Sequence, residues 1–117
     1  MSLESELTTI LKTVVTRTYP DVAPNGTLPP YCVYIQIGGD AITFVDNAVP
    51  SKRNAEMQIN IFAATRAQAV SLMLGVESAL TVATSIQARP VGAMRGALDD
   101  ESDLRGAEQD FTIWSDR

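Results

Sequence analysis

Apolar residues near the N-terminus recur with the spacing of an amphipathic helix. Leucine, isoleucine and valine side chains fall at i, i+4, i+7, i+8, i+11 and i+12, which places them on one stripe. Ser2 can cap this helix, and Glu4 and Glu6 lie in its first turn, where the helix dipole favours negative charge. Pro20 prevents the helix from continuing. The pattern predicts a core helix over residues 2–17.

The chain then changes to a period of two, which is typical of strands. Residues 31–37 place Cys32, Tyr34 and Gln36 on one side and valine and isoleucine on the other. Residues 56–63 give the clearest alternation, with apolar side chains separated by glutamine and asparagine. We expect one side of the sheet to be buried and the other to be mostly polar.

The segments around these strands have the composition of turns and loops. Residues 20–30 hold three separate proline sites and an Asn-Gly pair, which predicts an irregular loop. Gly-Gly-Asp at residues 38–40 suits a turn, after which residues 41–45 are expected to form a short return strand. Residues 47–54 are polar, contain a proline and are predicted to be a loop.

A second helix is predicted over residues 66–82. Thr65 and Gln68 have the spacing of a capping box, in which the N-cap hydroxyl accepts a hydrogen bond from the backbone three residues on. Gly75, in the middle of this helix, costs about 1 kcal/mol in helix propensity relative to alanine. We therefore expect Gly75 to permit the close approach of another element.

Two further strands are predicted after this helix. Residues 85–94 are the weaker candidate, because Pro90 interrupts them and a proline favours an edge strand or a bulge. Residues 97–105 form an acidic turn region, and residues 107–114 are predicted to be the last strand. The order of elements predicts one α+β domain over residues 1–117. It would have an N-terminal helix, a mostly antiparallel sheet of four to five strands, and a second helix packed on one face of the sheet.

The composition removes several classes of chemistry. Nine Lys and Arg against 14 Asp and Glu give a net charge of −5. An acidic domain repels phosphate at long range, so we expect no sequence-specific binding of nucleic acid. The chain has no histidine, which removes histidine general bases and histidine ligation of zinc or haem. We expect no enzyme activity, no metal and no cofactor.

Two other features concern the compartment. Cys32 is the single cysteine, so it cannot form an internal disulfide and is expected to be a small buried hydrophobe. The N-terminus carries two acids where a signal peptide needs basic charge, and no apolar stretch reaches the roughly 18 residues of a membrane helix. We expect synthesis in the cytoplasm and no membrane contact.

Two charged groups are the candidate interaction sites. One is the only adjacent basic pair in the chain, and the other is an acidic run before the last strand. Exposed charge groups of this kind are usually solvated, but each can also contact a partner of opposite charge. The six side chains are Lys52, Arg53, Asp99, Asp100, Glu101 and Asp103.

Other site chemistries fit the sequence less well. The acids alternate as in a calcium-binding loop, but Leu104 stands where that loop has its glycine and Asp110 where it has its glutamate. A solvated hairpin tip is the favoured interpretation. The glycine pair at residues 38–39 has neither the Walker nor the dinucleotide pattern.

Three motifs occur along the chain in an order that is characteristic of one family. Residues 19–34 form a proline-rich approach to a first strand, and a polar alternating strand then runs into Phe-Ala-Ala-Thr-Arg-Ala-Gln-Ala at residues 62–69. An acidic turn, Arg105 and Asp-Phe-Thr-Ile-Trp at residues 110–114 follow. Together these motifs cover nearly the whole chain, and they resemble the tail completion, or tail terminator, proteins of long-tailed bacteriophages.

The resemblance implies a location and a set of partners. It implies an α+β domain that assembles as a hexameric ring at the head-proximal end of the tail tube. Such a ring ends tube polymerisation and joins the tail to the head. The implied partners are further copies of this chain, the tail tube protein and the head connector protein. The implied location is the host cytoplasm during assembly and then the virion tail, and that family offers no catalytic residues to transfer.

Two alternatives stay open. Another head–tail connector or minor tail component of similar fold would differ only in where it docks. A small acidic module that binds a ligand or a basic protein partner would share the same charge and fold class, since a fold constrains function only weakly.

Overall fold

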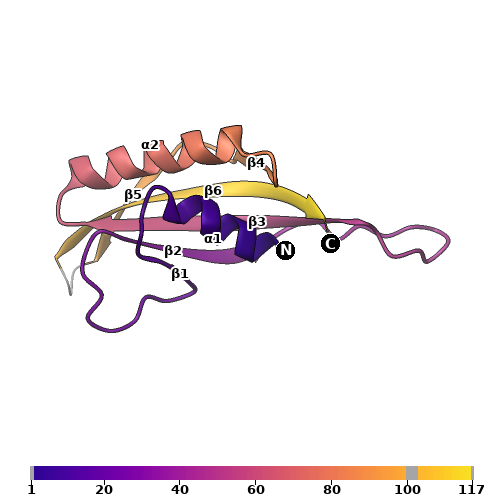
Figure 1. The fold of residues 1–117 in the computed structure, drawn as a ribbon, viewed down its shortest axis with the longest axis horizontal. Helices are drawn as coiled ribbons and strands as arrows, with labels where there is room; N and C mark the ends of the chain where they lie inside the picture. Colours follow the sequence, from indigo (N-terminus) through magenta and orange to yellow (C-terminus); the bar gives the residue numbers. More distant parts are fainter. Residues whose placement is uncertain (1, 100–102, 117) are drawn as a thin grey trace.

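A single sheet with helices on one face forms the body of the molecule (Figure 1). The structure is a computed structural model that describes residues 2–99 and 103–116. It confirms the predicted α+β class, although the described sheet has six strands and not four to five. In chain order the elements are α1 (Leu3–Lys12), β1 (Thr18–Pro20), β2 (Tyr31–Gly38), β3 (Lys52–Ala63), α2 (Arg66–Val82), β4 (Gln87–Pro90), β5 (Arg95–Asp99) and β6 (Leu104–Asp116).

The sheet is mostly antiparallel, as predicted. The strand order is β1-β2-β3-β6-β4, and β5 also pairs with β6. The one parallel pair among the described residues joins β1 to β2, with Thr18 opposite Cys32. The sequence pattern did not predict β1. Pro20 ends this edge strand, where its missing N–H costs no hydrogen bond within the sheet.

Helix α1 begins as predicted but ends earlier. The Ser2 side chain accepts a hydrogen bond from the Ser5 backbone N–H, and the helix stops at Lys12 instead of residue 17. The hydroxyl of Thr13 donates to the carbonyl of Ile10 at 2.6 Å, which competes with continuation of the helix. The run of β-branched residues that follows is a poor helix former, so the chain turns here toward β1.

The two longest strands, β3 and β6, pair along their whole length at the centre of the sheet. Their register runs from Lys52 opposite Asp116 to Ala63 opposite Arg105. The prediction of a loop over residues 47–54 was therefore wrong for its last three residues, which belong to β3. The predicted return strand at residues 41–45 is also wrong, because that segment has no strand partner in the described structure.

Helix α2 has the bounds that the sequence predicts. The Thr65 hydroxyl accepts a hydrogen bond from the Gln68 N–H at 3.2 Å. One stripe of the helix is buried against the sheet, at Ala69, Met73, Val76 and Leu80. A Cβ at Gly75 would lie 3.1 Å from a methyl group of Val14, which confirms the expected close approach. Neither helix of the described chain has the length and apolarity to cross a membrane.

An interrupted strand forms the far edge of the sheet. Both β4 and β5 pair with β6, and residues 91–94 separate them just after Pro90, as its presence predicted. The buried side chain of Gln109 donates a hydrogen bond to the carbonyl of Gly92 at 3.0 Å and so holds the interruption. The acidic turn is shorter than the predicted residues 97–105, because β5 continues to residue 99 and β6 starts at residue 104.

Candidate interaction site

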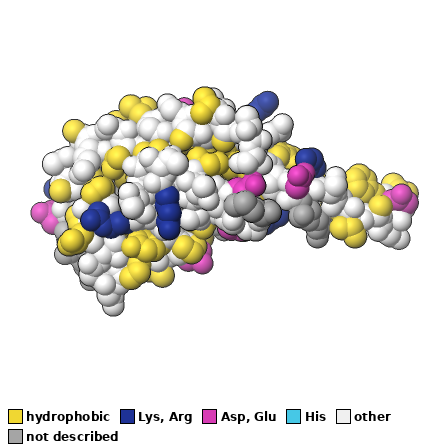
Figure 2. Space-filling view, viewed as in Figure 1, with side chains coloured by type: hydrophobic (Ala, Val, Ile, Leu, Met, Phe, Trp, Pro, Cys, Tyr) yellow, Lys and Arg dark blue, Asp and Glu magenta, His cyan; other side chains and the backbone are white. Residues whose placement is uncertain are grey.

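Residues 39–51, which we call the arm, extend from one end of the sheet between β2 and β3 (Figure 1). The arm lengthens the molecule to 53 × 26 × 24 Å. Phe44 and Val49 are exposed and Val45 is fully exposed. Figure 2 shows apolar side chains gathered along this projection. An exposed apolar segment of this kind is typical of a contact surface.

A buried asparagine fixes the root of the arm. Asn54 is 8% exposed, and its side-chain oxygen accepts a hydrogen bond from the backbone of Asp40 at 2.8 Å. Its amide nitrogen donates to the Thr112 hydroxyl at 3.0 Å and to the Ile113 carbonyl at 3.1 Å. Gly39 has a φ of 142°, and a Cβ there would lie 2.6 Å from the Asn54 carbonyl oxygen. The chain can therefore enter the arm along this path only with glycine at position 39.

Arg53 does not lie on an exposed loop, contrary to the prediction. It lies on β3, and its guanidinium donates to both oxygens of the Glu4 carboxylate, at 2.9 and 3.1 Å. It also donates to the side-chain oxygen of Gln36 at 2.9 Å. The hydrogen bonds from Arg53 hold the pKa of Glu4 below its usual value. Arg53 therefore joins α1, β2 and β3.

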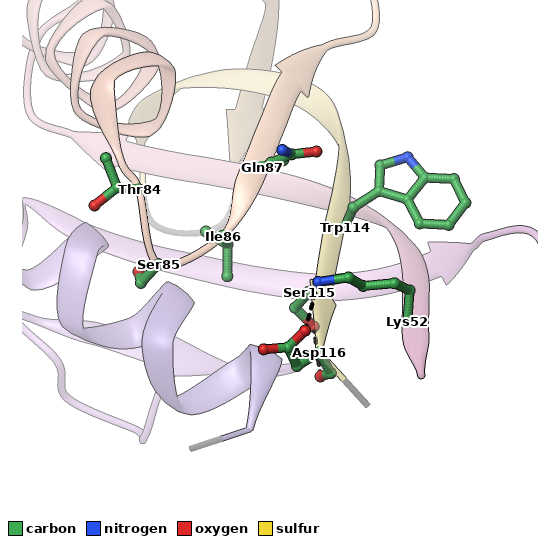
Figure 3. A pocket seen from close by; sticks show the side chains of 8 residues that line it. All are labelled: Lys52, Thr84, Ser85, Ile86, Gln87, Trp114, Ser115 and Asp116. Atoms are coloured by element: carbon green, nitrogen blue, oxygen red, sulfur yellow. Dashed lines mark hydrogen bonds and ion pairs between the residues drawn. The ribbon is translucent and has the colours of Figure 1, made fainter. Parts of the chain in front are cut away.

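Lys52 also lies on β3, and its ammonium group contacts the Asp116 carboxylate at 2.5 Å. This contact lowers the pKa of Asp116. Figure 3 shows the pair beside Trp114, on the rim of a cavity of about 350 Å³. Thr84, Ser85 and Ile86, from the segment between α2 and β4, line the other side of this cavity together with Gln87 of β4. More than half of the Lys52 side chain is exposed, so it stays available to a partner.

The described members of the acidic group, Asp99 and Asp103, lie at the opposite end of the sheet from the basic pair. Asp99 ends β5, and Asp103 precedes β6 with a φ of 54° and an ion pair to Arg105 at 3.1 Å. Asp100 and Glu101 lie outside the described residues. The structure therefore brings neither Asp99 nor Asp103 near the basic pair. Within residues 2–99 and 103–116, no three potential metal ligands of the His, Cys, Asp and Glu types are clustered.

The face of the sheet away from the helices is divided into a polar and an apolar part. On β3 and β6 this face carries mainly polar side chains, and Arg95 bridges Glu108 and Asp110 at 2.7 and 3.1 Å. On β2 the same face is wholly apolar. We call its four side chains the β2 stripe: Tyr31, Val33, Ile35 and Ile37.

A cavity of about 370 Å³, which we call the Val22 hollow, lies at the start of β2. Val22 is 74% exposed on its rim, and the rings of Tyr31 and Phe62 lie 5.5 Å apart at 36°. The hollow is lined by Asp21, Val22, Ala23, Tyr31, Val33, Asn60 and Phe62. It is mainly apolar and lies at the end of the sheet opposite to the arm.

The charge pattern of the sequence indicated charged residues as contacts and did not reveal these apolar ones. A signal was present, because residues 31–37 carry apolar side chains on both faces where a half-exposed strand should alternate. The second apolar face is the one that forms the β2 stripe. No sequence pattern indicated that Asn54 holds the arm root or that Glu4 binds Arg53, because each contact joins residues that are distant in sequence.

The comparisons with known proteins concern the fold. No family model matches the sequence, and no curated protein matches it. The structure is similar to a chain in "Virion of native gene transfer agent (GTA) particle", with a TM-score of 0.63 and 18% sequence identity. The match covers 99% of this chain and 96% of that chain. At this identity the likeness establishes a shared fold over the whole chain.

Proposed function

We propose that this chain is a structural component of a phage or phage-like virion, and specifically a tail terminator. In this role it forms a ring, in the proposed case a hexamer, at the head-proximal end of the tail tube. The ring ends tube polymerisation and joins the tail to the head connector. The proposal includes no enzymatic activity and no cofactor.

The observation that carries the proposal is the full-length likeness in fold to a virion chain. It covers all but a small part of both chains, so the arm and the sheet edges fall within the matched length. The order of sequence motifs that resemble tail terminators supports the finer assignment. Neither argument uses the other, because the structural neighbour is only 18% identical in sequence.

The surface of the molecule also suits assembly better than catalysis. The cavity beside Trp114 contains Lys52 and Asp116, and these two groups already neutralise each other. By contrast, the arm and the β2 stripe expose apolar side chains that a partner protein would cover. The net charge of −5 suits a ring through which DNA passes, because a lumen that bound phosphate would impede passage.

Five of the six charged residues keep their proposed role as partner contacts, and Arg53 is left out because it binds Glu4. The proposed partner contacts are Lys52 and the acids Asp99, Asp100, Glu101 and Asp103, of which the structure describes Asp99 and Asp103 at the end of the sheet opposite to Lys52. A Lys52→Glu variant tests this role at the expense of one exposed ion pair with Asp116, whereas an Arg53 variant would break the contact with Glu4 that joins α1 to β3. Loss of tail joining with normal folding would support the role of Lys52, and unchanged joining would contradict it.

Another head–tail connector or minor tail component is the second candidate, because the structural neighbour shows only the fold of a virion chain. The experiment that separates the two is deletion of the gene from the producing phage or prophage, with electron microscopy of the lysate. A terminator deletion leaves overlong tubes that are not attached to heads. A connector deletion leaves tails of normal length that are not attached to heads.

Complementation with the wild-type gene is the matched control. Restored tail length confirms the terminator assignment, and normal tails joined to heads in the deletion strain contradict any role in tail assembly. A complementary experiment adds the purified chain to polymerising tube protein. Shorter tubes with the chain at one end are expected.

A further inference from the structure

The arm is an apolar element that its own chain leaves uncovered. Phe44, Val45 and Val49 are 49%, 106% and 75% exposed. Beyond its root at Asp40, the arm has local hydrogen bonds, such as the Asn47 N–H to the Phe44 carbonyl at 3.1 Å. Figure 1 shows the arm pointing away from the body along the long axis of the molecule. Solvent exposure of such a segment is unfavourable, and a partner that buries it gains free energy.

The Val22 hollow lies at the opposite end of the same two strands. Strand β2 runs from Tyr31, which lines the hollow, to Gly38, which precedes the arm. Strand β3 returns from Lys52 to Phe62, which lines the hollow again. The molecule is 53 Å long, so an arm cannot reach the hollow of its own chain.

The β2 stripe extends the receiving surface from the hollow along the sheet. Ile35 and Ile37 are 39% and 46% exposed, whereas the neighbouring positions on this face, Gln58 and Glu56, are polar. Each limb of the arm has about six residues and can span roughly 20 Å when extended. An arm that enters from the hollow end can therefore cover both the hollow and part of the stripe.

We propose that the arm of one copy of this chain docks in the Val22 hollow and on the β2 stripe of a second copy. Both surfaces are apolar and at least partly exposed, and the arm and the hollow lie at opposite ends of one chain. One repeated contact therefore buries both, whereas a different partner on either surface would leave the other exposed. This contact is heterologous, and it closes into a ring or extends into a filament depending on the rotation between copies.

The inference rests on the proposed function only in that a ring needs a repeated head-to-tail contact. It is tested with the purified chain alone, by molar mass against concentration. Phe44→Asp disables the arm, and Val22→Asp disables the hollow at a side chain that is 74% exposed. Val82→Asp is the matched control, because Val82 is 76% exposed on α2, away from both surfaces. Circular dichroism and thermal unfolding verify that each variant is folded.

Each disabling change should weaken self-association by about 10-fold or more, whereas the Val82 control should associate like the wild type. An equimolar mixture of the two disabled variants is the sharpest test. The intact arm of the Val22→Asp chain docks in the intact hollow of the Phe44→Asp chain. The mixture should therefore form a dimer and stop there, because the remaining arm and the remaining hollow are both disabled.

A photocrosslinking amino acid at position 44 identifies the contact directly. Crosslinks to residues 21–23 or to Phe62 of another copy are expected, and the length of the molecule excludes a crosslink within one chain. The proposal is overturned if no such crosslink forms at the highest soluble concentration, or if the mixed variants stay monomeric. Crosslinking to another virion protein in tails, without self-association, would assign the arm to that protein.

These outcomes are independent of the terminator assignment. Arm-to-hollow dimers from a chain that does not shorten tail tubes would support the contact and contradict the proposed function. Tubes that are shortened equally by the wild type and by Phe44→Asp would support the function and contradict the contact.

Discussion

Arg53 and Glu4 form a two-pronged ion pair that links the first turn of α1 to the start of β3. The two hydrogen bonds are 2.9 and 3.1 Å long and join residues that are 49 positions apart. Lys52, the preceding residue, points to the other face of the strand and contacts Asp116. The two members of the basic pair therefore have different roles, one structural and one available to a partner.

The Glu4–Arg53 pair should make stability depend on pH. Glu4→Gln is expected to lower the free energy of unfolding by about 1 kcal/mol near neutral pH, since the pair is bidentate but partly solvent-screened. The folded-state pKa of Glu4 lies below its usual value of 4.5. Its contribution is therefore present above the unfolded-state pKa and is lost as the pH falls through the folded-state pKa. Urea unfolding of both proteins across the acidic range measures this difference.

Glu6→Gln is the matched control, because Glu6 lies in the same first turn of α1. The control separates the contact with Arg53 from the effect of the helix dipole. Equal losses in the Glu4 and Glu6 variants would show that the Arg53 contact contributes nothing. A Glu4 effect that persisted at the lowest pH would contradict the assignment to an ionised carboxylate.

Asn54 should control the order of the arm root. Asn54→Ala removes hydrogen bonds to Asp40, Thr112 and Ile113, and we expect a loss of about 1–3 kcal/mol in unfolding free energy. Hydrogen exchange at the Asp40 amide should also become faster than in the wild type. Asn60→Ala is the control on the same face of β3, where the side chain makes a 3.3 Å bond to Gln58. If both variants exchange alike at Asp40, Asn54 does not hold the arm.

The contact between Gly75 and Val14 should appear as a coupling in a double-mutant cycle. Gly75→Ala gains about 1 kcal/mol of helix propensity, but its new methyl would lie 3.1 Å from Val14. We expect little net change in the wild-type background and stabilisation of about 1 kcal/mol when Val14→Ala has removed the obstructing methyl groups. Chemical denaturation of the four proteins measures the coupling. Purely additive effects would contradict the close approach.

Cys32 should be inert in the folded protein. Burial raises the pKa of its thiol to about 12, so almost no thiolate is present at pH values where thiol reagents are used. We expect no reaction with a disulfide reagent under native conditions and complete reaction in denaturant. Rapid labelling of the native protein, at a rate independent of added denaturant, would show that the thiol is accessible.

The same thiol predicts a loss of stability in alkali. Because the folded-state pKa is raised from 9.0 to about 12, the contribution of the protonated thiol is complete below pH 9.0 and is lost as the pH rises toward 12. Cys32→Ala should not show this loss. Parallel slopes of stability against pH for the two proteins would contradict the assignment.

The elements that the sequence predicts correctly are those with local causes. Helix α2 has its cap, its apolar positions and its length within one segment, and it forms with the predicted bounds. The alternation in β2, β3 and β6 likewise follows from the period of two. The end of α1 was missed because the apolar spacing continues to Val15, whereas the Thr13 hydroxyl and the β-branched run end the helix at Lys12.

The arm could not be predicted from local pattern. Residues 41–45 have the composition of a strand, but a strand also needs a neighbour, and none is present within the described structure. For the candidate site, the sequence predicts an exposed charge at Lys52, and more than half of that side chain is exposed. The sequence could not reveal that Arg53 faces Glu4, or that the apolar residues of β2 face solvent, because both depend on the three-dimensional arrangement.

The position of β6 in the sheet has a consequence for synthesis on the ribosome. Strand β6 pairs with β3, β4 and β5, yet it is the last of these strands to be translated. Until residues 104–116 have left the exit tunnel, β3 lacks its central neighbour and β4 and β5 have nothing to pair with. The nascent chain can therefore pair β1, β2 and β3, but one edge of β3 and the strands β4 and β5 stay unpaired until β6 emerges.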